Sequence, residues 1–97
     1  MTDYTPADLD LVFAWLRART LDIRDAKPLP LFIATAKIRR YAIATGRDFG
    51  AWPNQRAVKA LLTQAGYRST SVRGPSGLRH AFHGIDALPD DAPDIAD

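Results

Sequence analysis

The sequence predicts a small α+β domain, with three helices followed by a C-terminal β-hairpin. Three segments carry apolar residues at the spacing of a helix face, and each ends or begins at residues that favour helix ends. Two extended segments near the end of the chain flank a turn of glycine, proline and serine. With 97 residues, the chain is long enough for one domain with a modest core. We expect this domain to span residues 1–85.

The first predicted helix begins after Thr5 and ends near Arg19. Thr5 is a favourable N-cap, Pro6 suits the first helical position, and Asp8 completes a capping box. One apolar face is assigned to the core and comprises Leu9, Val12, Phe13 and Leu16. A second stripe, roughly opposite, comprises Leu11, Trp15 and Ala18. Either Trp15 packs beneath the following loop, or this stripe is a surface for a partner protein or a second copy of the chain.

The middle of the chain predicts a connector and then a second helix. Residues 20–30 form the connector, because prolines on both sides of Leu29 oppose a helix there. A short strand, Leu21–Ile23, is expected to pair with the hairpin. The second helix is predicted at Leu31–Thr45 and ends at Gly46. Its core face comprises Leu31, Ala34, Thr35, Ile38, Tyr41, Ala42 and Thr45. A further stripe of Phe32, Ala36 and Ile43 predicts that a second side is also covered.

The third predicted helix, Asn54–Ala65, has one apolar and one positive face. Asn54 is a favoured N-cap, and Gly66 ends the helix. The apolar face comprises Val58, Leu61, Leu62 and Ala65. The opposite face is small, polar and positive, and comprises Arg56, Lys59, Ala60 and Thr63. The turn before this helix, residues 47–52, contains Phe49 and Trp52 as its apolar side chains.

The predicted hairpin is also basic. Its strands are Tyr67–Arg73 and Leu78–Ile85, joined by Gly-Pro-Ser-Gly. They contain no acidic residue, and their basic and titratable side chains are Arg68, Arg73, Arg79, His80 and His83. Residues 26–85 hold ten Lys or Arg residues and one acid, Asp48, although the formal net charge of the chain is only +2. A basic body of this kind attracts phosphate backbones.

A positive helix followed by a basic hairpin predicts a winged helix-turn-helix domain that binds nucleic acid, with duplex DNA favoured. The third helix would enter the major groove, where Arg reads guanine and Asn or Gln reads adenine. The candidate contacts on this helix are Asn54, Gln55, Arg56, Lys59 and Thr63. Arg73, Arg79 and His80 are expected to hold the backbone or the minor groove, and Arg39, Arg40 and Arg68 are further phosphate candidates. Trp52 is either a buried aromatic or a platform for a base.

Other functional classes lack the residues they need. There is no cysteine, which removes disulfides, thiolate metal sites and a cysteine nucleophile. Neither a GxxxxGK[ST] nor an HExxH motif is present. His80 and His83 are three apart on a predicted strand, so they should point to opposite faces and not share a metal. We expect no enzyme, metal or cofactor. No apolar run reaches the roughly 20 residues of a membrane span, and the acidic start is unlike a signal peptide, so we expect a cytoplasmic protein.

The last segment, residues 86–97, contains five aspartates, two prolines and no basic residue. It has no helical or strand periodicity, so we expect an acidic, mobile tail. Two roles are open for it. The tail either keeps the protein soluble or folds back and screens the basic face, in which case its deletion would tighten DNA binding.

Three segments also match a family pattern. They are Tyr41-Ala42-Ile43-Ala44-Thr45-Gly46, then the helix from Pro53-Asn54 to Leu62-Thr63-Gln64-Ala65-Gly66, and then Gly77-Leu78-Arg79-His80-Ala81-Phe82-His83-Gly84-Ile85. Through these three segments, the region 34–88 resembles the C-terminal winged-helix domain of phage, plasmid and poxvirus-type primase–helicases. The motor and primase domains of that family are missing. The resemblance therefore implies DNA binding in phage or mobile-element replication or regulation, without unwinding or primer synthesis. The alternative is a protein adaptor or inhibitor built on the same fold, supported by the Trp15 stripe and the acidic tail.

Overall fold

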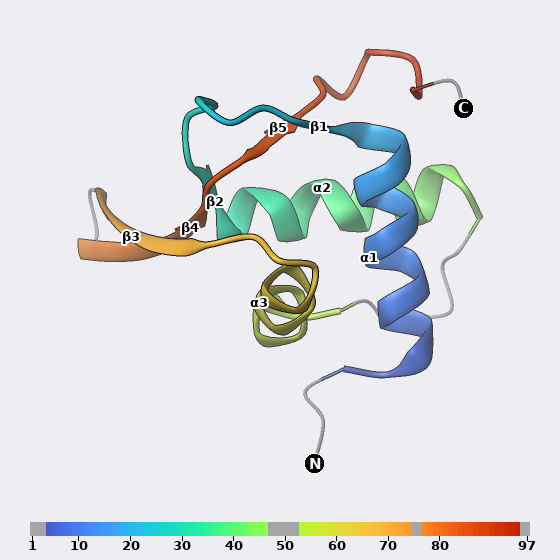
Figure 1. Ribbon diagram of the computed structural model, residues 1–97. Helices are drawn as coiled ribbons and strands as arrows, with labels where there is room; N and C mark the ends of the chain where they lie inside the picture. Colours follow the sequence, from blue (N-terminus) through green and yellow to red (C-terminus); the bar gives the residue numbers. More distant parts are fainter. Residues whose placement is uncertain (1–3, 47–52, 75–76, 96–97) are drawn as a thin grey trace.

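The computed structural model describes residues 4–46, 53–74 and 77–95. Within these ranges the chain is a small α+β domain of three helices and two small antiparallel sheets, an arrangement compatible with a winged helix (Figure 1). The elements follow the order α1 (Pro6–Arg19), β1 (Thr20–Asp22), β2 (Leu29–Pro30), α2 (Leu31–Ala44), α3 (Gln55–Gln64), β3 (Ser69–Gly74), β4 (Gly77–Phe82) and β5 (Ile85–Ala87). None of these helices has the length and apolar character needed to cross a membrane.

The helix ends lie where local capping chemistry predicts them. Before α1, the Thr5 hydroxyl oxygen accepts a bond from the Asp8 N–H (3.1 Å) and the Asp8 carboxylate accepts one from the Thr5 N–H (3.0 Å). This is the predicted capping box, and it satisfies two amides that a helix start leaves without partners. Asn54 caps α3, and Gly66 follows it with φ of +99°, a conformation that glycine adopts without steric cost.

The prediction for the two apolar stripes of α1 is confirmed in part. Val12, from the predicted core face, is 0% exposed, and Trp15 is buried, as one of its two alternatives required. Trp15 and Leu11, from the stripe predicted to be secondary, are 1% and 6% exposed, whereas Leu9, Phe13 and Leu16 are only partly buried. The reason is that α1 contacts α2 on one side and α3 on another, so both stripes meet a neighbour. The surface for a partner or second copy that was predicted around Trp15 and Leu11 is therefore not exposed, because these side chains lie in the core.

On α2, the predicted core face is largely confirmed and the predicted second covered side is not. Leu31, Ala34, Thr35, Ile38 and Ala42 are buried, Tyr41 is half-buried and Thr45 is exposed. The further stripe faces solvent, since Phe32 and Ile43 are 42% and 55% exposed and Ala36 is exposed as well. The helix has neighbours on the sides that face α1, α3 and the hairpin strand β4, and of the stripe Phe32 lies against Arg79 of β4 while keeping 42% of its surface exposed.

The strands make two separate sheets. The order β2-β4-β3 places the strand before α2 beside the second strand of the hairpin, with Leu29 opposite Phe82 and Pro30 opposite Ala81. A short strand was predicted at 21–23 with the hairpin as its partner. Instead, β1 lies one residue earlier and pairs with β5, and β2 is the strand that joins the hairpin.

The predicted second hairpin strand is divided by a bend at Gly84. Gly84 has φ of +85°, and its carbonyl accepts a hydrogen bond from the Ile23 N–H (3.1 Å). The chain therefore leaves the hairpin after Phe82 and continues as β5 alongside β1. Phe82 and Ile85, on either side of this bend, are both almost fully buried and join the core with Trp15, Ile38 and Leu61.

The C-terminal residues are part of the fold. Residues 86 and 87 belong to β5, and residues 88–95, called the strap below, run along α1 and α2. The Leu88 N–H donates to the Arg19 carbonyl and the Ile95 N–H donates to the Ala18 carbonyl, both at 2.9 Å. The sequence had predicted a mobile tail here. Figure 1 shows the strap on the side of α1 and α2 opposite α3, so it does not screen α3.

The apolar side chains predicted at Phe49 and Trp52 fall outside the part of the chain that is described.

Candidate nucleic-acid interface

The outward face of α3 gathers the side chains that the sequence predicted to contact DNA. Arg56, Lys59, Ala60 and Thr63 follow one another at helical spacing and together line a shallow hollow in the surface. Arg56 and Thr63 are exposed, and Lys59 is half-buried. The Thr63 hydroxyl donates to the Lys59 carbonyl (2.8 Å), which leaves its oxygen as an acceptor. This face carries two positive charges, no acid, and a small alanine that permits close approach.

The face is held in place by the other side of the same helix. Ala57, Val58, Leu61 and Leu62 are 0–2% exposed and pack into the core. The direction of the Arg56 and Lys59 side chains is therefore determined by the burial of their neighbours. A preorganised helix of this kind loses little conformational freedom when it binds a groove.

Asn54 has the capping role that the sequence predicts for it. Its side-chain oxygen accepts a hydrogen bond from the Ala57 N–H at 2.9 Å and so caps α3. An Asn that reads adenine uses both its amide oxygen and its amide NH2 group. Since the oxygen already serves the cap, the neighbouring Gln55, which is exposed at the first helical position, is the better candidate for such a contact.

The basic residues of the hairpin divide between its two faces. Ser71 lies opposite His80, Val72 opposite Arg79, and Arg73 opposite residue 78. Paired residues share a face of an antiparallel ribbon and successive residues alternate, so Arg73 and His80 share one face and Arg79 lies on the other. Arg73 and His80 are exposed, whereas Arg79 is half-buried with its guanidinium carbon 4.8 Å from the centre of the Phe32 ring. The sequence predicts that all three hold the backbone or the minor groove, and the register distributes them over both faces of the hairpin.

The remaining candidates lie apart from α3. Arg68 is exposed at the base of the hairpin, where its carbonyl accepts a bond from the His83 N–H (3.0 Å). Arg39 is exposed on α2. His83 lies in the bend after β4, so the alternation of a strand does not decide its direction relative to His80. Among the described side chains, no group of three or more His, Asp or Glu residues is arranged to hold a metal ion.

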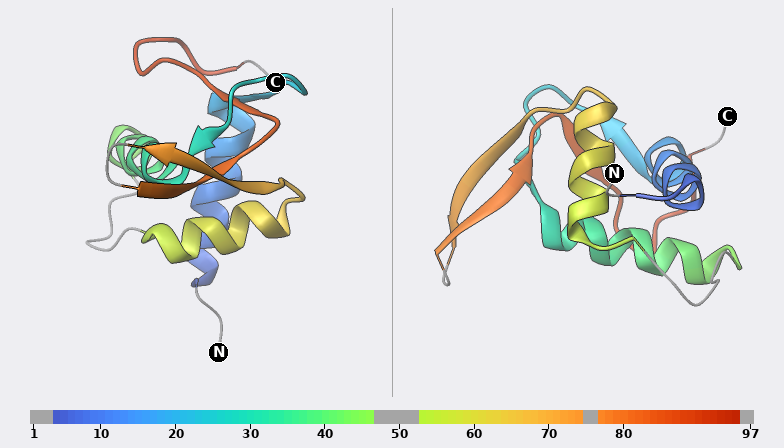
Figure 2. Two further views of the ribbon diagram at one scale, coloured as in Figure 1. Left: turned by 90° about the vertical axis from the view of Figure 1, so that its left-hand side faces the viewer. Right: turned by 90° about the horizontal axis from the view of Figure 1, so that it is seen from below.

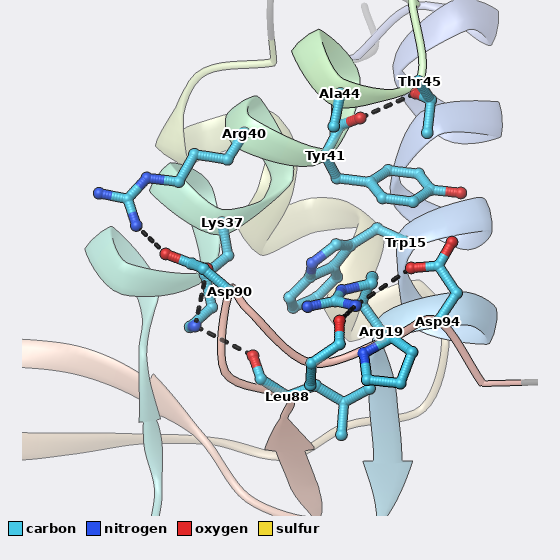
Figure 3. Close-up of a pocket in the computed structure, with 12 residues that line it drawn as sticks. Trp15, Arg19, Lys37, Arg40, Tyr41, Ala44, Thr45, Leu88, Asp90 and Asp94 are labelled. Carbon is cyan, nitrogen blue, oxygen red and sulfur yellow. Dashed lines mark hydrogen bonds and ion pairs between the residues drawn. The ribbon is translucent and has the colours of Figure 1, made fainter.

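Arg40 is engaged with the strap. Figure 3 shows the Lys37 ammonium and the Arg40 guanidinium both directed at Asp90, with a Lys37 Nζ to Asp90 Oδ1 distance of 3.3 Å. The hydrogen bond from Lys37 is the main cause that lowers the pKa of Asp90, and the charges of Lys37 and Arg40 act in the same direction. Arg40 therefore pairs with a carboxylate on the side of the molecule away from α3, and not with the surface that α3 presents.

Arg19 makes the second connection to the strap. Its guanidinium donates to the Asp94 carboxylate (3.1 Å) and to the carbonyls of Pro89 and Ala92. Arg19, Ala92 and Asp94 help to line a pocket between α1, α2 and the strap, together with Trp15 and Tyr41 (Figure 3). The sequence contained a signal for this contact, because five aspartates follow a segment with a large excess of positive charge. The absence of periodicity in the tail concealed it.

A further polar contact was not anticipated from the sequence. The Tyr67 hydroxyl donates to Asp22, which joins the segment after α3 to β1. Burial is the main cause that raises the pKa of Tyr67 to about 12, and the hydrogen bond and negative charge of Asp22 add to it. Tyr67 is therefore neutral at physiological pH, and its hydroxyl serves as a donor.

Comparisons of the chain with protein-family models, curated proteins and solved structures found no match.

Proposed function

We propose that the chain is a winged helix-turn-helix domain that binds duplex DNA, with α3 in the major groove. The observation that carries the proposal is the outward face of α3, where Arg56, Lys59 and Thr63 lie together on a helix anchored in the core, and none of the residues that line this hollow is acidic. The major groove of B-DNA admits an α-helix, and exposed Arg, Gln and Thr side chains have the donors and acceptors that read base edges there.

The arrangement of the elements supports the finer assignment to the winged-helix fold. Two successive helices, α2 and α3, precede the hairpin, and the strand before α2 completes a three-stranded sheet with it. In Figure 2 the hairpin projects beyond the helices, as a wing would. In this binding mode α3 reads bases, while Arg73 and His80 at the projecting hairpin lie near the phosphate backbone.

The residues behind the primase–helicase resemblance fall on these same elements. They occupy the end of α2, all of α3, and the region from β4 into β5. We extend the proposal to a DNA-binding module of a phage or mobile-element replication or regulatory protein on that basis. The adaptor alternative loses its two supports, because Trp15 is buried in the core and the acidic strap pairs with the chain's own helices.

A salt series of binding titrations tests the proposed function. Fluorescence anisotropy with labelled random duplex and single-stranded DNA should show duplex binding that weakens with salt. If about five phosphates are neutralised, the slope of log K against log salt should be about −4 to −5. The double variant Arg56→Ala/Lys59→Ala should weaken binding and lower the slope by about 1 for each of the two side chains that contacts a phosphate, because a side chain that contacts only a base edge changes specificity and not the slope.

Arg24→Ala is the matched control for the double variant. Arg24 is exposed in the connector between β1 and β2, outside the face of α3, so its loss should leave the slope nearly unchanged. A flat salt dependence of the unmodified protein, or equal effects of the control and the double variant, would reject α3 as the DNA-binding element.

A further inference from the structure

The hairpin needs a contact that fixes its direction. Its strand β4 pairs with β2 only at Phe82 and Ala81, because β2 is two residues long. From His80 outward, β4 pairs with β3 alone. A two-stranded ribbon without a third strand or a packed face has little stability of its own in water. The projecting half of the hairpin therefore depends on side-chain contacts with the rest of the domain.

The Arg79–Phe32 stack is placed to provide that contact. β2 ends at Pro30, and the chain enters α2 directly, so that Phe32 lies in the first turn of the helix just beyond the last paired residue of β2. Arg79 lies on β4 two positions beyond Ala81, the partner of Pro30, and its guanidinium lies over the Phe32 ring. A planar guanidinium stacks well on an aromatic face. Backbone pairing with β2 thus holds β4 at Phe82 and Ala81, and the stack of Arg79 on Phe32 holds β4 two residues farther along.

We propose that Arg79 is a positioning residue that braces the hairpin against α2 through Phe32, so that the opposite face, with Arg73 and His80, is presented to the DNA backbone. This inference rests on the proposed function and changes the role predicted for Arg79, which the sequence had assigned to direct contact with DNA. It also gives Phe32 a role: a large aromatic side chain that is 42% exposed on the surface is the platform for the hairpin.

Salt-dependent DNA binding separates a brace from a phosphate contact. Arg79→Gln should weaken binding about two- to fivefold, the range of an exposed cation–π contact, with no change in the salt slope. Phe32→Leu removes no charge and should weaken binding by a similar factor. The double variant Phe32→Leu/Arg79→Gln should be no weaker than either single variant, because both remove the same contact. Arg73→Gln should instead lower the slope by about 1.

The matched control is Ile43→Ala, which truncates another exposed apolar side chain at the other end of α2 and should leave binding unchanged. A salt slope that falls by about 1 in Arg79→Gln would show that Arg79 itself contacts a phosphate. Unchanged affinity in Phe32→Leu would also overturn the brace.

Hydrogen exchange in the DNA-free protein tests the brace independently of the proposed function. Amides of β3 and β4 beyond Ala81 should exchange faster in both Phe32→Leu and Arg79→Gln, by about two- to fivefold, while amides in α1 keep their rates. If the unmodified protein binds no DNA but these rates rise, the brace stands and the proposed function fails. Unchanged exchange rates in both variants would reject the brace.

Discussion

At the scale of single residues, neighbouring side chains at the start of α3 have different roles. The Asn54 side chain caps the helix by accepting a hydrogen bond from the Ala57 N–H, whereas the next residue, Gln55, has an exposed side chain. Both are amides, and the sequence had assigned both to base contact. Their roles differ because only Asn54 occupies the cap position, where a short side chain reaches back to the helix amides.

We predict that Asn54→Ala and Gln55→Ala separate stability from DNA binding. Asn54→Ala should lower the free energy of unfolding by about 1 kcal/mol, measured by urea denaturation, because α3 loses its cap. Gln55→Ala should leave stability nearly unchanged and reduce discrimination between duplexes at one base pair by about 1–3 kcal/mol. If Asn54→Ala changed discrimination at constant stability, the assignment of these two residues would be reversed.

Some residue-scale features were predictable from the sequence and one more should have been. Thr5 with Asp8, and Asn54 with Gly66, are local signals, so the ends of α1 and α3 were predicted correctly. The sequence also predicts that Arg73 and Arg79 lie on different faces of the hairpin. With position 74 paired with position 77, position 73 pairs with position 78, which places residue 79 on the opposite face. The charge of the hairpin alone does not show this, because it takes no account of the alternation of side chains between the two faces of a strand.

At the scale of elements, the strap binds its own helices through matched charges. Asp90 faces Lys37 and Arg40, Asp94 faces Arg19, and two backbone hydrogen bonds hold its ends to α1. Periodicity predicts only segments that have a regular buried face, and the strap has none. The same limit explains the error on α1, because an apolar stripe does not reveal how many neighbours will cover the helix that carries it.

We predict that the strap stabilises the domain and does not inhibit DNA binding. The double variant Asp90→Asn/Asp94→Asn should lower the thermal unfolding midpoint at low salt, and the loss should shrink at high salt because exposed ion pairs are screened. Asp91→Asn is the matched control, since Asp91 is an exposed neighbour on the strap. DNA affinity should change little, because the strap lies on the side of α1 and α2 opposite α3 and its charges are paired with residues of α1 and α2. A large gain in affinity would instead support the screening role considered from the sequence.

At the scale of the whole molecule, the sequence predicted the class of fold and the order of the helices, but not the way in which its distant parts join. The pairing of β1 with β5 and the bond from Tyr67 to Asp22 both connect the first third of the chain to the last. Neither leaves a local pattern, because the residues involved are ordinary in their own segments. Contacts of this kind depend on the completed fold.

We predict that the Tyr67–Asp22 bond makes global stability sensitive to alkaline pH. Because the pKa of Tyr67 is raised from 10 to about 12 in the folded state, its contribution is fully present below pH 10 and is lost as pH rises towards 12. The unfolding midpoint should therefore fall more steeply between pH 10 and 12 in the unmodified protein than in Tyr67→Phe. Parallel curves for the two proteins would show that this hydroxyl does not couple to unfolding.

The pairing of β1 with β5 has a consequence for the order of events during synthesis. Thr20, Leu21 and Asp22 are synthesised well before their partners Ala87, Asp86 and Ile85, which lie far along the chain from them. The three helices are able to form before residues 85–87 have left the ribosome, whereas the sheet of β1 and β5 has to wait for these residues. A ribosome stalled before residue 85 would therefore hold an incomplete domain, with Trp15 and its neighbours accessible to chaperones.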